Sequence, residues 1–103
     1  MKDTELYSEN AEQGILGAIL IKRGIVAHVS SLVGPGDFYK QAHKVTFQIM
    51  QEMALQGESI DIVNLEERLR RAGVLEKAGG VLYVTHLGHV EATAAGVDNY
   101  CQT

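Results

Sequence analysis

Apolar residues recur at helical spacing along most of this chain. Between Asn10 and Ile21 they are four residues apart, in two rows: Ala11, Ile15 and Ile19, and Leu16 and Leu20. This i,i+4 spacing predicts a buried helix. Gly14 and Gly17 lie inside it, and each glycine costs roughly 1 kcal/mol relative to alanine in a helix. Either another helix backbone packs closely against them, or they are tolerated without a packing role.

Two further helical patterns follow. The first runs from Ile25 to Val33 and stops at Gly34–Pro35–Gly36; its β-branched residues also suit a strand, but the helical period favours a helix. The second, over residues 45–54, is the longest amphipathic pattern of the chain and ends before Gly57. We expect Phe38 to fold back under the start of this third helix, and Asp37 to interact there with the helix dipole.

A fourth helix is predicted by Ile62, Leu65 and Leu69, and Gly73 closes it. Asp61 can cap its amino end, and Asn64 with Glu67 offers a second capping arrangement one turn later. The fourth helix therefore begins either at Asp61 or one turn later at Asn64.

Residues 81–90 form an ambiguous segment. Val81, Tyr83 and Thr85 alternate like a strand, whereas Tyr83, Leu87 and Val90 repeat like a helix. A lone strand would have no partner in a chain whose other segments are helical, so we predict a helix. Residues 92–100 have the pattern of a further helix that has begun by the end of the sequence.

Together the patterns predict an all-α fold, a compact orthogonal bundle of about five to six helices. The 103 residues suit one domain, and 46% hydrophobic with 21% charged residues is typical of a globular protein. Proline occurs once and no Ser-, Gln- or Gly-rich tract interrupts the chain. We therefore predict no linker and no second domain within residues 1–103.

The charge balance argues against a primary DNA-binding surface, because nine basic and thirteen acidic residues give a net charge of -4. The basic run Arg68, Arg70 and Arg71 precedes Gly73, where cations oppose the negative end of the helix dipole.

Cys101 is the single cysteine and has no internal disulfide partner, and the amino terminus lacks the pattern of a signal peptide. The longest apolar stretch, residues 15–21, is shorter than the roughly 20 residues that cross a bilayer. A cytoplasmic location is expected.

Candidate catalytic and metal-binding residues are weakly supported. The chain has no G-x-x-x-x-G-K-[ST] phosphate loop and no Gly-Lys pair, so we predict neither ATP hydrolysis nor a cofactor. His86 and His89, with Glu91 nearby, could share a helix face, but a closed zinc site needs about four ligands and Cys101 is not at a zinc-motif spacing. We interpret these histidines as surface or interface residues and predict no metal.

Four other features have structural and functional interpretations. His43 with Asp37 could form an acid–base pair, but no nucleophile or oxyanion motif accompanies them, and a packing role for His43 is favoured. The Gly79–Gly80 pair is too short for a dinucleotide fingerprint and predicts a tight turn. No basic cluster activates Cys101. Tyr83 suits the edge of the core or a partner surface, and both remain open.

Four short segments, in this order and at this spacing, carry a resemblance to a known family. They are Ala11–Glu12–Gln13 running into residues 15–20; Asp37–Phe38–Tyr39 with His43; residues 61–65 with Leu69; and Leu75–Glu76 followed by Gly79–Gly80 and Tyr83. From about residue 8 to residue 100 the chain resembles the N-terminal domain of the bacterial and phage replicative DNA helicases of the DnaB family. The resemblance implies an all-helical bundle followed by a helical hairpin, of which residues 92–103 would be the start.

The resemblance also implies a function. The chain would be a non-catalytic domain of a hexameric 5'-3' DNA helicase that supports ring assembly with other helicase subunits and docks the C-terminal domain of primase or a helicase loader. ATP and Mg would bind in a motor domain outside this chain. The implied partner-binding residues are Asn10, Glu12, Gln13 and Tyr83, although Asn10 replaces a common acidic residue and Gly14 a common small apolar one.

Three further expectations follow. Without a complete hairpin, the chain should be monomeric or weakly self-associating. The alternative function is a small helical DNA-binding regulator, which predicts a salt-dependent affinity for DNA. A third hypothesis is a small metal enzyme built on His86 and His89.

Overall fold

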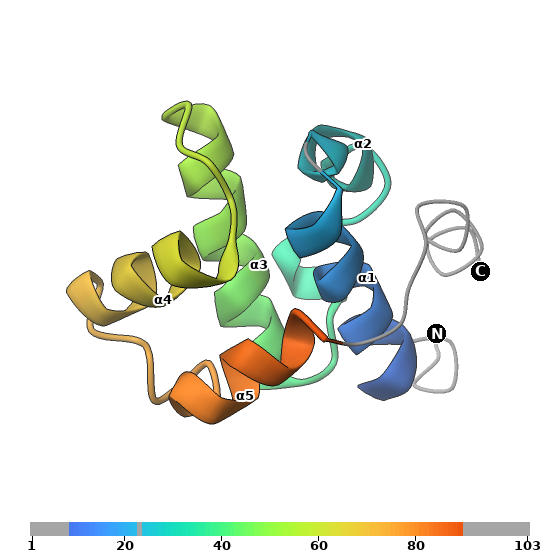
Figure 1. Ribbon diagram of the computed structural model, residues 1–103. Coiled ribbons are helices and arrows are strands. Elements are labelled where there is room, and N and C mark those ends of the chain that lie inside the picture. The colour runs from blue at the N-terminus through green and yellow to red at the C-terminus, as the bar shows by residue number, and fades with distance from the viewer. Residues whose placement is uncertain (1–8, 23, 90–103) are drawn as a thin grey trace.

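The computed structural model describes residues 9–22 and 24–89, and these residues form an all-helical bundle (Figure 1). The elements are α1 (Glu9–Ile21), α2 (Ile25–Ser30), the 3-10 turn η1 (Pro35–Asp37), α3 (Gln41–Leu55), α4 (Ile62–Arg71) and α5 (Gly80–Leu87). No strand occurs in this part of the chain. The all-α prediction is confirmed, including the helix over residues 81–87. The further helix expected from residue 92 lies outside the described residues.

Helix α3 lies at the centre of the bundle. It contacts α1, α2, η1 and α4, while α5 packs across α1 and α4 (Figure 1). Its buried face, which includes Phe47, Met50 and Met53, joins fully buried leucines of α1, α4 and α5: Leu16, Leu65, Leu69 and Leu87. The ring centroid of Phe38 lies 5.0 Å from that of Phe47. Phe38 is thus the predicted anchor beneath the start of α3.

Helix α1 is the predicted buried helix, and the glycines inside it are buried as well. Gly14 and Gly17 both lie in the interior, on a helix that contacts α2, α3 and α5. Burial alone does not distinguish close packing of another helix backbone from tolerated glycines, so both interpretations stay predictions. No helix of the described residues is long and apolar enough to cross a membrane.

Two predictions around residues 30–37 are wrong in detail. Helix α2 ends at Ser30 rather than Val33, because the chain must be extended at Gly34, which precedes Pro35. Asp37 does not lie at the start of α3. It belongs to η1, and its Oδ2 accepts a hydrogen bond of 2.8 Å from the amide of Gly34.

The structure decides how α4 begins and ends. Asp61 is the N-cap, since its Oδ1 accepts a 2.8 Å hydrogen bond from the amide of Asn64. At the other end, Gly73 has a left-handed φ of 76° and the amide of Val74 donates to the carbonyl of Leu69 at 3.0 Å. This is the Schellman arrangement that a glycine after the helix predicts.

Candidate functional site

A buried glutamate and a buried histidine pair in the middle of the bundle. Glu12 of α1 is 1% exposed and His43 of α3 is 0% exposed, and Glu12 Oε1 lies 2.6 Å from His43 Nδ1. The carboxylate also accepts backbone hydrogen bonds from Tyr39 (2.5 Å) and Lys40 (3.3 Å). Two backbone donors and the imidazole nitrogen therefore surround a carboxylate whose burial would otherwise be costly.

The same histidine reaches α5. His43 Nε2 lies 2.6 Å from the hydroxyl oxygen of Tyr83, and the side-chain amide of Gln13 donates to that oxygen at 3.0 Å. The rings of His43 and Tyr83 stack with their centroids 5.9 Å apart and an angle of 16°. We call these four residues, Glu12, Gln13, His43 and Tyr83, the polar network. It joins α1, α3 and α5.

The glycine pair before α5 makes room for the tyrosine of this network. Gly79 and Gly80 have φ values of 107° and 86°, which favour glycine. A Cβ atom on Gly79 would lie 2.6 Å from Cδ2 of Tyr83, so the tyrosine ring occupies the space above this residue. The predicted tight turn is confirmed, and it also positions Tyr83.

The network brings together three of the four residues that the sequence suggested for partner binding. Gln13 and Tyr83 are half-buried at its edge. The carboxylate of Glu12 is directed inward, so Glu12 does not offer it to a partner in this structure, and its influence on binding would have to be indirect. Asn10 lies in α1, and its side chain lies outside the described residues.

His43 is the member of the network that the sequence did not suggest for partner binding. The favoured packing role holds, and the Asp37–His43 acid–base pair does not form: His43 faces Glu12, while Asp37 caps η1. The apolar period contained a signal for the burial of both Glu12 and His43. Glu12 lies four residues before Leu16, and His43 lies four before Phe47, so each polar side chain occupies a buried stripe.

A carboxylate, an imidazole and a hydroxyl in series resemble the orienting part of a catalytic triad. Here the acid and the imidazole are buried, and the hydroxyl already bonds to both His43 and Gln13. The chemistry that this geometry supports is the orientation of Tyr83.

The histidines suspected of metal binding do not form a site in the part of the chain that the structure describes. No group of three His, Cys, Asp or Glu residues there could hold a metal ion. His86 instead packs beside Tyr83, with ring centroids 6.2 Å apart. Glu91 and Cys101 lie outside the described residues.

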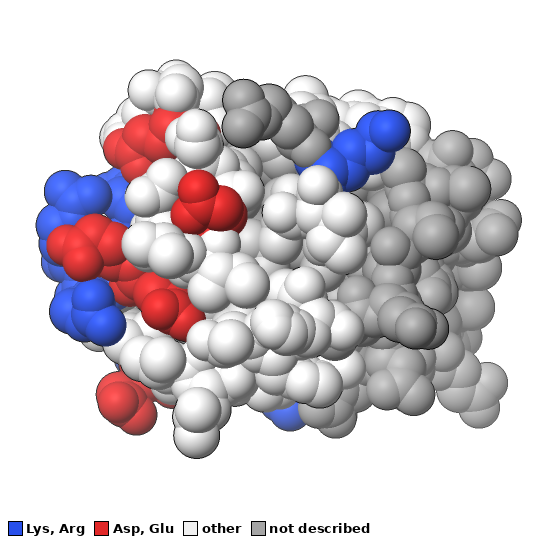
Figure 2. All heavy atoms as spheres, viewed as in Figure 1, with Lys and Arg blue, Asp and Glu red and all other residues white. Residues whose placement is uncertain are grey.

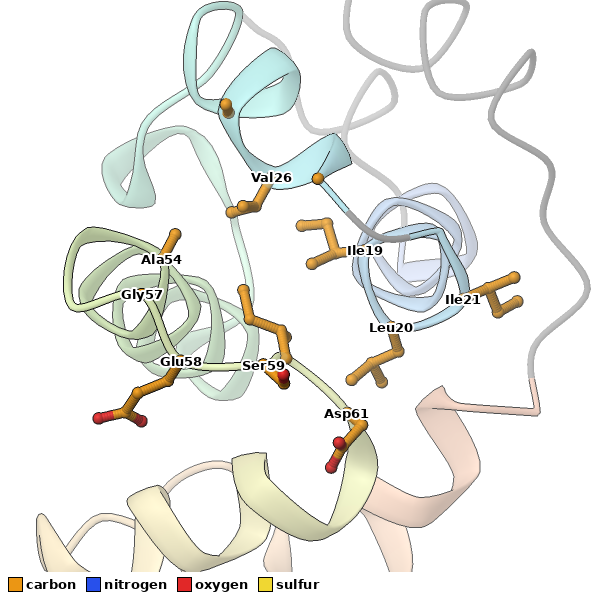
Figure 3. A pocket seen from close by; sticks show the side chains of 12 residues that line it. Ile19, Leu20, Ile21, Val26, Ala54, Gly57, Glu58, Ser59 and Asp61 are labelled. Atoms are coloured by element: carbon orange, nitrogen blue, oxygen red, sulfur yellow. The ribbon is translucent and has the colours of Figure 1, made fainter.

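A pocket of about 510 Å³ opens between α1, α2 and the connection from α3 to α4 (Figure 3). Its walls are mainly apolar and include Ile19, Leu20 and Val26. The acidic side chains at its edge have structural partners, since Asp61 caps α4 and Glu58 lies 3.3 Å from the Arg68 guanidinium. Among the described residues, its lining offers no histidine or cysteine as a base or nucleophile.

Residues 4–103 match the model of a protein family described as the DnaB-like helicase N terminal domain. The chain belongs to this family. The resemblance carried by the four sequence segments is thereby confirmed.

Relatives and solved structures of the DnaB family agree with this assignment. The chain is 35% identical over 106 residues to the replicative DNA helicase DnaB of Geobacillus stearothermophilus, covering 96% of this chain and 23% of that protein. It is 36% identical over 94 residues to DnaB of Pasteurella multocida (strain Pm70), covering 91% and 20%. The chain thus spans only about a fifth of the length of these relatives.

Two solved structures share the fold. The crystal structure of the N-terminal domain of DnaB helicase from Mycobacterium tuberculosis matches with a TM-score of 0.84 and 33% identity, over 91% of this chain and 65% of that one. A structure of a DnaB-like replicative helicase and its interactions with primase matches with a TM-score of 0.78 and 27% identity, over 92% and 22%. The bundle is therefore a DnaB N-terminal domain fold.

Proposed function

We propose that this chain is a non-catalytic docking and assembly domain of a hexameric replicative DNA helicase, and that it docks the C-terminal domain of primase at the edge where α1 meets α5. The observation that carries this proposal is the polar network. It holds the half-buried Gln13 and Tyr83 together and fixes them to the central helix. Support also comes from the solved DnaB-like helicase whose description includes interactions with primase.

A rigid, partly exposed tyrosine beside an amide is well suited to protein binding. Tyrosine contributes a large contact area at a small entropic cost and is enriched among the residues that dominate interfaces. Because the ring stacks on His43 and packs over Gly79, little side-chain freedom remains to be lost on binding. Asn10, one helical turn before Gln13 on α1, would extend the same contact.

Docking can be tested by titrating the isotope-labelled chain with the C-terminal domain of primase, using NMR shifts and calorimetry. We expect shifts centred on Gln13 and Tyr83. Tyr83→Phe should weaken binding by roughly tenfold, the equivalent of about 1.4 kcal/mol, because it removes the hydroxyl but keeps the ring. No response of the unmodified chain at high micromolar primase would contradict the proposal.

Leu55→Ala is the matched control for surface changes. Leu55 is 88% exposed and lies twelve residues after His43 on α3, about 18 Å along the helix from the network. Its truncation should leave primase binding unchanged. A helicase loader is the other candidate for the same edge, and a parallel titration with the loader distinguishes the two partners.

Ring assembly and the absence of catalysis complete the proposal. We expect ATP and Mg²⁺ to bind in a motor domain outside this chain, and the domain to act with replication proteins in the cytoplasm. A phosphate-release assay on the chain alone should give no ATP turnover above the buffer background, since the sequence has no phosphate loop.

Light scattering should show a monomer or a weak oligomer for the chain alone, and a stable hexamer of these 103 residues would contradict this.

A further inference from the structure

With the His43 imidazole neutral, counting the protons gives the hydrogen bonds of the polar network a direction. The Gln13 amide donates to the Tyr83 oxygen, so the single proton of the tyrosine hydroxyl is available for His43 Nε2, 2.6 Å away. Nε2 then accepts, and the imidazole carries its proton on Nδ1, which donates to the Glu12 carboxylate. Every donor then has an acceptor, and the hydrogen bonds run in series from Gln13 through Tyr83 and His43 to Glu12.

This direction determines what Tyr83 offers to a partner. Its proton points inward to His43, so its oxygen is only an acceptor toward the outside. A group that approaches at the remaining lone pair, or in place of the Gln13 amide, must donate a hydrogen bond.

The surroundings of the Tyr83 ring are occupied on two sides. Lys40 Nζ lies 5.4 Å from the centroid of the ring, and His86 packs beside the same ring. Glu12 is enclosed behind His43. The hydroxyl oxygen is therefore the atom of the network that a partner's hydrogen-bond donor can approach, and an amide or a hydroxyl group is such a donor.

We infer that Glu12 is a positioning residue: through His43 it keeps the Tyr83 proton inward, and so makes the α1–α5 edge select a partner that presents a hydrogen-bond donor. The inference rests on the proposed docking function. It gives the buried Glu12 a role in binding without a direct contact.

Glu12→Gln tests the inference without removing a binding group. The shorter backbone bond, from Tyr39, goes to Oε2, whereas His43 faces Oε1. An amide can keep its oxygen toward Tyr39 and turn its NH₂ group toward Nδ1, with loss of the longer bond from the Lys40 amide to Oε1. Nδ1 must then accept, the imidazole proton moves to Nε2, and the Tyr83 proton turns outward. An amide that selects the other histidine tautomer is a known consequence of such a substitution.

Two readouts decide the outcome. Nitrogen NMR of His43 should report the Nδ1-protonated tautomer in the unmodified chain and the Nε2-protonated tautomer in Glu12→Gln. Affinity for the C-terminal domain of primase should fall roughly tenfold in Glu12→Gln, comparable to Tyr83→Phe. Glu67→Gln is the control of equal charge change, since Glu67 is 53% exposed and pairs with arginines of its own helix, and it should change neither readout.

Several results would overturn the inference. It fails if the unmodified chain is not Nδ1-protonated, if Glu12→Gln leaves the tautomer unchanged, or if the tautomer switches while primase affinity stays constant. Failure of the unmodified chain to bind primase would instead remove the proposed function, and the two tautomer measurements would still decide whether Glu12 sets the direction of the network.

A second variant tests the inference if circular dichroism shows that the Glu12→Gln protein does not fold. Gln13→Glu is at the half-buried edge and replaces the donor to Tyr83 by an acceptor. It should draw the hydroxyl proton away from His43, protonate Nε2 and weaken primase binding. An unchanged His43 nitrogen spectrum in this variant would overturn the inference.

Discussion

Tyr83 is held from three sides, and each side is a different kind of interaction. Its ring stacks on His43, its Cβ and ring edge pack over Gly79, and its hydroxyl bonds to His43 and Gln13. The sequence left Tyr83 between core and partner surface. In the structure it packs against the core and is half-buried at the end of the polar network, and its role in partner binding stays a prediction.

His43→Ala should be among the more destabilising single changes in the described bundle. It leaves the buried Glu12 carboxylate without its imidazole partner and removes the hydrogen bond to Tyr83. We expect the free energy of unfolding to fall by about 3 kcal/mol, measured by urea denaturation. His89→Ala, at an exposed position, should change the free energy of unfolding by no more than about 0.5 kcal/mol. A similar loss in both variants would show that the polar network does not contribute more to stability than a surface histidine.

Gly79→Ala and Gly80→Ala form a matched pair. Both residues have positive φ, which costs an L-residue about 1–2 kcal/mol. Only at Gly79 would the new Cβ also collide with Tyr83; at Gly80 nothing lies within 4 Å. Denaturation should therefore show a larger loss for Gly79→Ala, and only this variant should shift the NMR signals of Tyr83. Equal losses would mean that backbone strain alone explains the glycine pair.

At the scale of elements, hydrophobic period predicted which segments are helical but not their ends. The rows of apolar residues gave α1, α3 and α4 directly, and α5 once a lone strand had been rejected. The end of α2 and the place of Asp37 were wrong, because Pro35 inserts a short 3-10 turn that a period of 3.6 residues does not reveal. Pairing between helices was also hidden: the sequence shows Glu12 and His43 on buried stripes, but not that the two stripes face each other.

The cap of α4 gives a prediction at this scale. Asp61→Ala removes the acceptor for the Asn64 amide and should cost about 1 kcal/mol of unfolding free energy. Asp61→Asn should cost little, since asparagine caps about as well as aspartate. Thermal denaturation of the two variants separates the contribution of the capping hydrogen bond from that of the carboxylate charge. An equal loss of stability in both variants would mean that the charge, and not the hydrogen bond, stabilises α4.

For the whole molecule, the arrangement of charge bears on what the domain can bind. Figure 2 shows basic and acidic side chains intermingled on the side where α4 lies, while much of the middle of this face is uncharged. The basic run of α4 is neutralised locally: Arg68 lies within 4 Å of two glutamates, Glu52 and Glu58, and Arg70 and Arg71 pair with Glu67. All three arginines lie in the last turn of α4, where the sequence predicted them.

A DNA-binding measurement distinguishes a surface with locally neutralised arginines from the alternative function, a small helical DNA-binding regulator. Non-specific DNA-binding proteins have dissociation constants of about 1–100 μM at physiological salt. With a net charge of -4 and its arginine run paired with glutamates, the isolated chain should bind more weakly than about 100 μM. Fluorescence anisotropy of labelled single-stranded and duplex DNA measures this. A Glu67→Gln variant, which releases Arg70 and Arg71, is the control for an unmasked basic run. Affinity of the unmodified chain in the low micromolar range that falls steeply with added salt would favour the regulator, because only phosphate contacts produce that dependence.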